Sequence, residues 1–335
     1  MAAVLLWSGC VTPRIQPHAD QGALAHDHPD YNTTIQVQYL GNEGFFFRRG
    51  DYAVIAAPLY TNPHWLHVGL WSLRPDTVLI DWLHPRPPEL QVDAILVGHA
   101  HYDHLLDVPY IARKHHPEAR VYGSLTAANL TLASEPSLEG RVVALDDEVA
   151  RGRRPGTWFY VADSTIRFMA VESAHGPQAA KVHIMKGKIE SRLKRPPRTA
   201  WGWKEGETLA YIVDFMGPDQ SIDFRIYFED TTLPDSTGLP PVLPPADQHP
   251  YDLVVMCVAA AQALREYPTN LTTVVQPKHV MLGHWEDFFR SPVKPPKRLL
   301  ITHIDRFIDE VLAASPDTQW LLPQPGAIYH YQPER

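Results

Sequence analysis

Four side chains that can bind a metal stand within six residues of the sequence. His99, His101, Asp103 and His104 form an HxHxDH pattern directly after the apolar segment AILVG. Imidazoles and a carboxylate gathered this closely desolvate and repel one another unless a cation holds them. His99 and His101 alternate along an extended segment and can converge on one ion, while Asp103 and His104 point to a neighbouring ion. The spacing therefore predicts two adjacent metal ions.

The elements around this motif must hold it in place. Residues 94–97 predict a buried strand, followed by a loop and by a helix that continues until shortly before Pro117. A strand that leads into a helix through a polar loop is a common ligand-binding position in α/β proteins. Further strands are expected in two groups, with helices near 258–266 and 301–313. This pattern predicts two sheets packed face to face inside one α/β domain.

Composition narrows the class of protein. The chain has 335 residues and a formal net charge of -8, which argues against general affinity for nucleic acid or anionic membranes and leaves only a local patch for such partners. It contains two cysteines, Cys10 and Cys257, so disulfides do not hold the fold together. No segment approaches the roughly 18 apolar residues that span a bilayer.

With this motif the chain resembles the metallo-β-lactamase superfamily. The resemblance implies a four-layer αββα sandwich and three further ligands in chain order. These are His175 in FMAVESAHGP, Asp230 in FRIYFEDTT and His284 in KHVMLGHWEDFF. Together with the motif they complete a set of seven ligands for two divalent ions. Zinc is the favoured metal, with manganese or iron as alternatives.

Two segments are similar to one branch of that superfamily, which includes the bacterial ascorbate-phosphate lactonase and the phospholipase D acting on N-acyl phosphatidylethanolamines. The segments are VQYLGNEGFFFRRGDYAVIAAPLYTNP and GHWEDFF. The branch usually carries an Asp before the proline after the third strand, whereas this chain has Ala57 before Pro58. Loss of that carboxylate, which supports the metal-binding loop, implies a change in metal affinity or preference.

The ligand set implies an enzyme, a metal-dependent hydrolase in which two cations bridge a water and lower its pKa, giving a hydroxide. Asp230 is expected to bridge the metals and Asp103 to orient the nucleophile. The group that protonates the leaving oxygen stays open among Tyr102, His84 and a metal-bound water. The favoured substrate is a phosphodiester, including one derived from a phospholipid. A lactone or carboxylic ester is the alternative, and a non-catalytic metal-binding lipoprotein is the other class considered.

A basic insertion at about 177–206 bears on the substrate. It follows His175 and is rich in Lys and Arg, with Trp201 and Trp203 near its end. It could lie over the metals as a lid that binds a phosphate or touches an anionic bilayer. The alternative is a solvated loop.

The N-terminus suggests a location. Residues 1–10 are apolar and end in Ser8-Gly9-Cys10, which resembles a bacterial lipoprotein signal. Residues 11–33 then predict a polar tether, and 34–335 a single domain. We expect an exported lipoprotein anchored to a membrane through Cys10, or a cytoplasmic protein if the segment is no signal. The expected partner is a small-molecule or lipid-derived ester and not nucleic acid, while the oligomeric state stays open.

Overall fold

Two seven-stranded sheets face each other in the computed structural model, which describes residues 16–177, 183–234, 237–300 and 302–333. The first sheet has the order β14-β1-β2-β3-β4-β5-β6, and the second has the order β13-β12-β11-β10-β9-β8-β7. The first consists of β1 (Ile35–Gly41), β2 (Gly44–Arg49), β3 (Tyr52–Ala56), β4 (Gln91–Leu96), β5 (Arg120–Gly123), β6 (Val142–Ala144) and β14 (Ile328–Tyr331). The second consists of β7 (Phe159–Val161), β8 (Ile166–Ser173), β9 (Thr208–Met216), β10 (Ile222–Phe228), β11 (Leu253–Cys257), β12 (His279–Gly283) and β13 (Gln319–Leu321).

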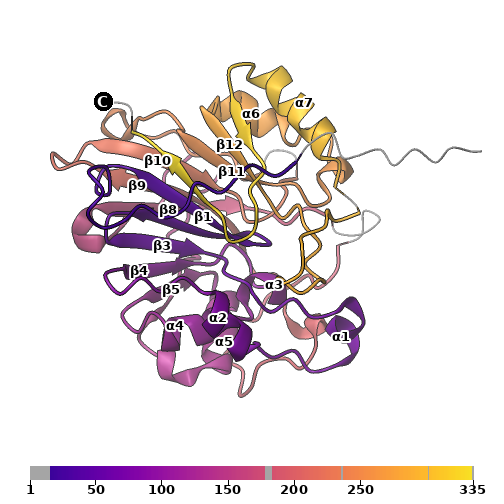
Figure 1. Ribbon diagram of the computed structural model, residues 1–335. Coiled ribbons are helices and arrows are strands. Elements are labelled where there is room, and N and C mark those ends of the chain that lie inside the picture. The colour runs from indigo at the N-terminus through magenta and orange to yellow at the C-terminus, as the bar shows by residue number, and fades with distance from the viewer. Residues whose placement is uncertain (1–15, 178–182, 235–236, 301, 334–335) are drawn as a thin grey trace, which may run out of the picture.

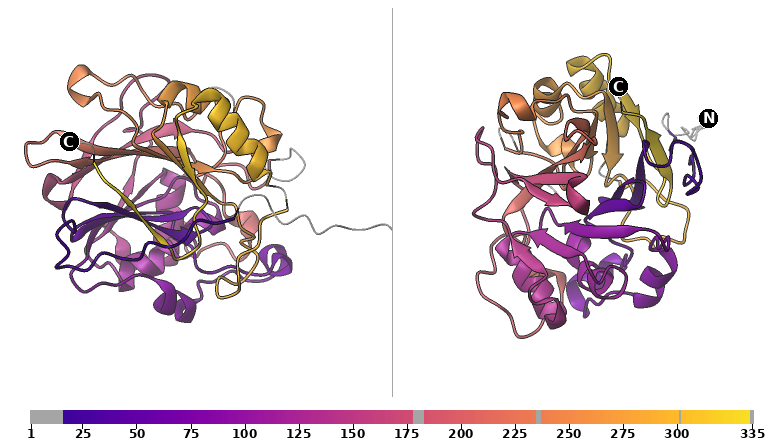
Figure 2. Two further views of the ribbon diagram at one scale, coloured as in Figure 1. Left: turned by 45° about the horizontal axis from the view of Figure 1, so that its top comes forward. Right: turned by 90° about the vertical axis from the view of Figure 1, so that its left-hand side faces the viewer.

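Helices cover the outer face of each sheet, as Figures 1 and 2 show. Those on the first sheet are α2 (Thr77–Leu83), α4 (Val108–Lys114) and α5 (Leu125–Ser134), and those on the second are α6 (Thr269–Val275) and α7 (Ile304–Ala314). Ile80 of α2 and Ile111 of α4 belong to one buried cluster with Ile55 and Ile95 of the first sheet. Burial of such aliphatic side chains drives the layers together. The predicted αββα sandwich is confirmed.

The burial and the direction of the strands explain how the two sheets position the ligands. β9 (TLAYIVDFM) is buried along its whole length, as expected of a strand covered on both faces. In each sheet antiparallel strands give way to parallel ones, at β3–β4 in the first and at β10–β11 in the second. The ligand-bearing segments all begin where a strand ends, namely β4, β8, β10 and β12. The sandwich thus brings four distant parts of the chain to one place.

Two helix predictions need correction. The helix expected after the motif is divided into α3 (Tyr102–Leu105) and α4, because Pro109 begins a new helix in its first turn. The helix expected near 258–266 is wrong, since only Ala261–Ala263 forms a 3-10 turn and α6 begins after Pro268. Ala260 adopts a left-handed backbone with φ 58°, which interrupts a helix despite the alanine-rich composition.

The N-terminal predictions fall partly outside the described residues. The expected signal at 1–10, Cys10 included, and residues 11–15 lie there. The tether expected over 11–33 is wrong for its described part. The amide of His18 donates to Leu322 O at 2.8 Å, and that of Gln21 donates to Ile328 O at 3.0 Å. Tyr31 is buried, so this segment packs as an edge of the domain. Among the described residues, helices of a length and apolarity suited to crossing a bilayer do not occur.

Candidate metal centre

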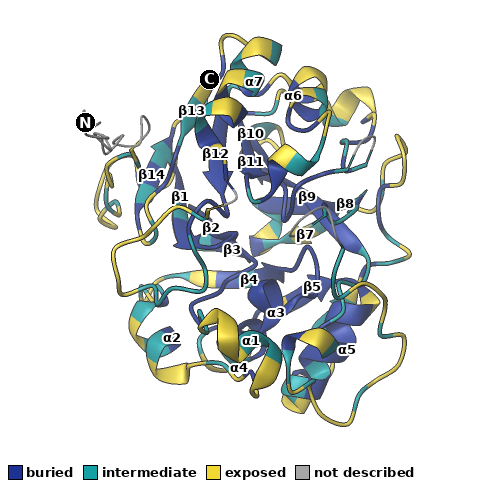
Figure 3. Cartoon of the chain, turned by 90° about the vertical axis from the view of Figure 1, so that its right-hand side faces the viewer, coloured by how far each residue is buried: buried dark blue, intermediate teal, exposed yellow. Residues whose placement is uncertain are grey.

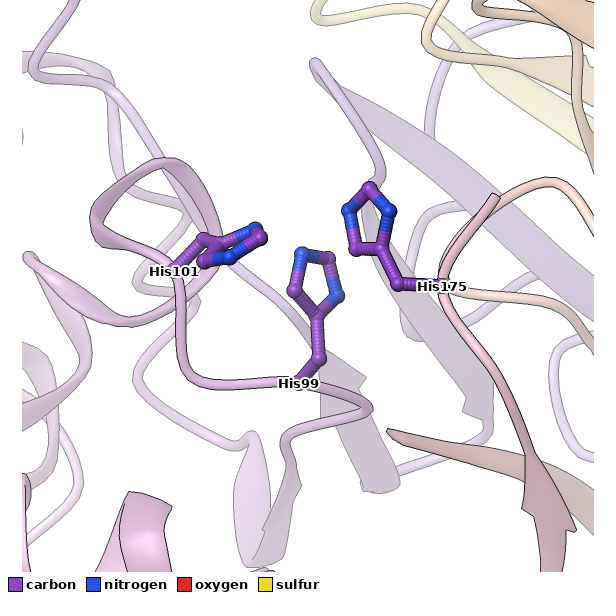
Figure 4. A group of neighbouring side chains, drawn as sticks. All are labelled: His99, His101 and His175. Atoms are coloured by element: carbon purple, nitrogen blue, oxygen red, sulfur yellow. The ribbon is translucent and has the colours of Figure 1, made fainter. Parts of the chain in front are cut away.

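The seven predicted ligands lie together where their strands end, in three overlapping groups. Within each group the ligand atoms lie within 4.8 Å of one another. The groups are His99, His101 and His175; His99, His104 and Asp230; and Asp103, His104 and His284. Figure 4 shows the imidazoles of the first group converging from two chain segments. Since His99 and His104 each belong to two groups, the arrangement suits two adjacent ions.

Asp230 lies at the centre of the site and connects its two halves. Its Oδ2 accepts from His99 Nδ1 at 2.6 Å and its Oδ1 accepts from His104 Nδ1 at 2.9 Å. Burial alone would raise the pKa of Asp230, but the two imidazoles outweigh it and lower the pKa to about 2. Asp230 is therefore ionised at neutral pH, as a metal-bridging carboxylate must be.

The protonation state and the unpaired nitrogens of the histidines suit metal binding. The Nε2 atoms of His99 and His101 are buried, and no hydrogen-bond partner for them lies in the described part of the chain. The Nδ1 of His175 donates to Gly176 O at 2.6 Å, a bond that fixes the imidazole tautomer. Burial, together with His99, lowers the pKa of His101 to about 3. Neutral imidazoles with buried, unpaired nitrogens fit divalent metal ions.

Asp103 completes the second half of the site. Its Oδ2 lies 3.6 Å from His104 Nε2 and 3.8 Å from His284 Nε2. Burial opposes ionisation of Asp103, but the neighbouring histidines hold its pKa well below the usual range. The carboxylate is thus ionised and can bind a cation with these two imidazoles.

A layer of polar residues behind the ligands was not predicted from the sequence. Asn42 donates through Nδ2 to Asp103 O at 2.5 Å and accepts through its carbonyl from His284 N at 2.5 Å. Glu286 accepts from the Asn42 amide at 2.5 Å and from the Tyr39 hydroxyl at 2.5 Å. Asn42 therefore connects two metal-binding loops. The only sequence signal was a polar pair, Asn42-Glu43, at a turn whose residues prove to be buried.

Ala57, which replaces the usual Asp of the resembled branch, is buried after β3 with a left-handed φ of 38°. Its amide donates to Leu96 O at 2.9 Å, next to the motif loop. Because alanine has no carboxylate, this position cannot hydrogen-bond the metal-binding loop as the usual Asp does. Asn42, which donates to Asp103 O, is one of the residues that hold this loop.

An apolar pocket of about 240 Å³ opens beside the ligands. Its walls include Val68 of α1 (Trp65–Leu70), Met185 of the insertion, and Phe288, Phe289 and Leu299. Tyr102 also borders the pocket, along with five of the ligands. An apolar substituent of a substrate therefore has a place next to the metal ligands.

Two residues of the described part of the basic insertion (183–206), Ile184 and Met185, form part of the wall of this pocket. The Met185 backbone hydrogen-bonds His101. Ile189 is held against α5, because its amide donates to Thr126 Oγ1 at 2.8 Å and its carbonyl accepts from Asn129 Nδ2 at 2.8 Å. The segment is therefore anchored at Met185 and Ile189, while 186–188, 190–192 and 194–196 are exposed to solvent.

The charged residues of the insertion lie elsewhere. Lys186 and Lys188 border a second recess together with Arg151 and Glu207, and His175 borders both cavities. Lys188 lies 3.5 Å from Glu207 Oε2. Of the two tryptophans expected at an interface, Trp201 is exposed, but Trp203 is buried and donates through Nε1 to Pro197 O.

His84, one of the groups considered for protonating a leaving oxygen, is buried away from the pocket. Its Nδ1 pairs with the Tyr60 hydroxyl at 2.9 Å and its Nε2 with His116 Nε2 at 2.7 Å. It belongs to the layer of helices over the first sheet. His84 is therefore neither a solvated loop residue nor within reach of a substrate in the pocket.

This histidine pair predicts a loss of stability in acid. Burial, helped by His115, lowers the pKa of His116 from 6.5 to about 4. The unfolded chain therefore binds more protons than the folded one between these values, so the free energy of unfolding falls as pH drops from 6.5 towards 4. The loss from His116 is at most about 3 kcal/mol. In metal-free protein, denaturant unfolding from pH 7.5 to 4.5 should show a shallower decline for His116→Gln than for wild type, and parallel declines would contradict this prediction.

Comparison with known proteins agrees with this fold. A family model described as a beta-lactamase superfamily domain matches residues 71–285. A search of curated proteins found no match. A novel metallo hydrolase from the archaeon Ignicoccus hospitalis has a similar structure, with a TM-score of 0.51 and 14% identity over 90% of this chain and 100% of that chain.

Two other solved structures have TM-scores of 0.48. They are the metallo-beta-lactamase fold protein YhfI from Bacillus subtilis, with 10% identity over 89% of this chain and 100% of that chain, and the isothiocyanate hydrolase from Delia radicum gut bacteria, with 13% identity over 89% and 99%. The family model covers well over half of the sequence and includes all seven predicted ligands, from His99 to His284. The chain belongs to the beta-lactamase superfamily and has the metallo-β-lactamase fold.

Proposed function

We propose that the chain is a metal-dependent hydrolase that holds two divalent cations, with zinc favoured over manganese or iron. The observation that carries this proposal is that His99 and His104 are each shared between donor groups beside one pocket. Histidine nitrogens and carboxylate oxygens are ligands suited to these metals. When bound, two such cations would supply Lewis acidity and make a water more acidic.

The side chains of the site divide the work. His99, His101 and His175 would hold one cation, and Asp103, His104 and His284 the other, with Asp230 between them. Asp103 is ionised and can also accept a hydrogen bond from the attacking water and orient it. Tyr102 borders the pocket, and burial raises its pKa well above the usual value. It stays protonated at neutral pH and is our candidate for the proton donor to a leaving oxygen.

We favour a phosphodiester, including a phospholipid-derived one, as the substrate. Two adjacent cations suit displacement at phosphorus, and Lys186 supplies a positive charge in the recess that His175 also borders. The sequence similarity to the phospholipase D of the resembled branch supports the same choice. The apolar wall of Met185, Phe288 and Leu299 favours a second candidate, a lactone or carboxylic ester, whose neutral carbonyl needs no cationic side chain.

Metal analysis coupled to turnover tests the proposal. Protein purified without added metal is assayed with bis-(p-nitrophenyl) phosphate, p-nitrophenyl butyrate and a γ-lactone before and after chelation, and again after zinc or manganese readdition. We expect close to two metals per chain, with turnover that chelation removes and readdition restores. Two metals with no turnover on any substrate would favour the non-catalytic alternative, and a site that never binds two ions would overturn the dinuclear proposal.

Substitution of Lys186 separates the two substrate classes. Lys186→Ala should raise KM for the phosphodiester and leave the butyrate ester unaffected, because only the phosphodiester carries a negative charge. Lys194→Ala is the matched control, since it removes an exposed cation of the same insertion outside the recess. Equal KM values of the two variants for the phosphodiester would show that Lys186 does not bind the phosphate.

A further inference from the structure

The largest exposed apolar side chains near the metal pocket gather around α1. This helix has no buried residue. The α1 patch consists of Trp65, Leu66, Leu70, Trp71 and Trp201, which are between 43% and 71% exposed. Trp201 belongs to the same surface, because a Cβ added at Gly69 of α1 would lie 3.3 Å from the Trp201 indole nitrogen. Figures 1 and 3 show α1 projecting from the body of the molecule on the side where α3 begins.

The α1 patch is continuous with the metal pocket. Val68, on the same helix, forms part of the pocket wall with Leu299, and the next residue, Leu300, is 95% exposed. Val68 and Leu299 thus bring an apolar wall of the pocket close to the exposed apolar residues of the α1 patch. Monomeric proteins rarely expose contiguous apolar surface without a partner for it.

Charge indicates which partner this surface fits. The three segments that meet here, 64–75, 191–204 and 288–300, contain no Asp or Glu, although the whole chain carries a net charge of -8. The amide of Leu73 donates to Arg198 O at 2.7 Å, and Val68 lines the same pocket as Phe288 and Leu299, so the three segments lie side by side. Their exposed cations are Arg74, Arg192, Lys194, Arg195, Arg198, Lys294, Lys297 and Arg298. Within the described ranges Arg192 pairs with Glu139 at 3.0 Å, and none of the other seven forms an ion pair with a carboxylate.

We propose that the α1 patch binds the surface of an anionic lipid bilayer. Tryptophan side chains prefer the boundary between lipid and water, and a ring of Lys and Arg attracts acidic headgroups. A lipid surface accounts for both the apolar centre and the unpaired cations around it. Binding does not depend on the proposed hydrolysis. Passage of a lipid-derived ester from the bilayer into the pocket does rest on the proposed function.

Vesicle binding tests this surface directly. Full-length protein carrying Cys10→Ser, which removes any acyl anchor at that residue, is sedimented with vesicles of phosphatidylcholine alone or mixed with phosphatidylserine. We expect binding that is stronger with phosphatidylserine and weakens with salt. In this background Trp65→Ser/Trp71→Ser should lower the partition coefficient at least about tenfold, because two apolar side chains no longer enter the interface.

A matched control is Tyr160→Ser. Tyr160 is 53% exposed, about as much as Trp71, but it faces Arg167 near the start of β8, while His175 follows the far end of that strand. The Tyr160→Ser variant should bind vesicles as strongly as the wild type. Absence of vesicle binding, or equal binding by the double variant, would overturn the proposal. A wild-type dimer that the double variant loses would assign the patch to a second copy of the chain instead.

The metal-free protein should bind vesicles as well as the loaded one. A protein that binds vesicles but hydrolyses no ester would contradict the proposed function and leave the α1 patch proposal standing. One that hydrolyses soluble esters without binding vesicles would contradict only the α1 patch proposal.

Discussion

The substitution His101→Ala is expected to lower kcat/KM at least about 100-fold. Loss of a residue that only supports a metal ligand typically lowers activity about 10–100-fold, and His101 is itself a predicted ligand. His101 contributes a buried Nε2 to the group formed with His99 and His175. Without it that group keeps two donors. Metal content should therefore fall from about two towards one per chain, as elemental analysis would measure.

The fold should survive this change. In the metal-free protein the Nε2 of His101 has no partner among the described residues, so the truncation removes one hydrogen bond, the one with the Met185 backbone, and leaves the strands untouched. Circular dichroism and the thermal midpoint of metal-free His101→Ala should match those of metal-free wild type. His303→Ala, at an exposed histidine, is the control for the substitution itself. Full turnover in His101→Ala with two bound metals would exclude the assignment of this ligand.

Gly98→Ala should weaken the binding of both metals without changing any ligand. A Cβ at position 98 would lie 2.1 Å from Asp230 Cβ and 2.4 Å from its Oδ2, far inside contact distance. Asp230 is the carboxylate that His99 and His104 share, so its displacement disturbs both halves of the site at once. We expect a loss of turnover at least as large as in His101→Ala, together with weak binding of both metals. Overpacking of this kind also costs about 1–3 kcal/mol of stability.

Gly140→Ala is the control for Gly98→Ala. No atom lies within 4 Å of a Cβ added there, although φ is 86° and the substitution should carry a modest backbone cost of about 1 kcal/mol. Metal competition titrations and thermal unfolding of both variants separate loss of the site from loss of stability. If Gly98→Ala binds two metals as tightly as Gly140→Ala, the close packing of Gly98 on Asp230 does not position that carboxylate.

The sequence was informative where chemistry is local. Four ligands in one HxHxDH motif need no tertiary knowledge, whereas His175, Asp230 and His284 were reached only through the order of segments in a resembled family. Gly98 could not be recognised, because its contact joins it to a residue more than a hundred positions away. Its importance follows from how closely the Asp230 side chain packs on the Gly98 backbone, and sequence patterns carry no such distance.

The insertion shows a different limit of sequence reasoning. Its many Lys and Arg left a phosphate-binding lid open beside a solvated loop, but the residues that line the pocket are Pro177, Ile184 and Met185, while Lys186 and Lys188 border the recess beside it. An irregular segment has no repeat that tells inward from outward positions. The expectation that His84 could protonate a leaving oxygen failed for a similar reason. A histidine before a proline resembles a loop residue until Tyr60 and His116 are seen to enclose it.

The origin of the ligands has a mechanical consequence for the sandwich. The motif follows β4 of the first sheet, while His175, Asp230 and His284 follow β8, β10 and β12 of the second. A cation bound by both His99 and His175 would cross-link the two sheets, because each sheet would supply one of its ligands. Separation of the sheets would then require release of the ion, so free metal concentration becomes a variable of folding as well as of catalysis. Amide exchange in both sheets should slow on metal loading, even at positions distant from the pocket.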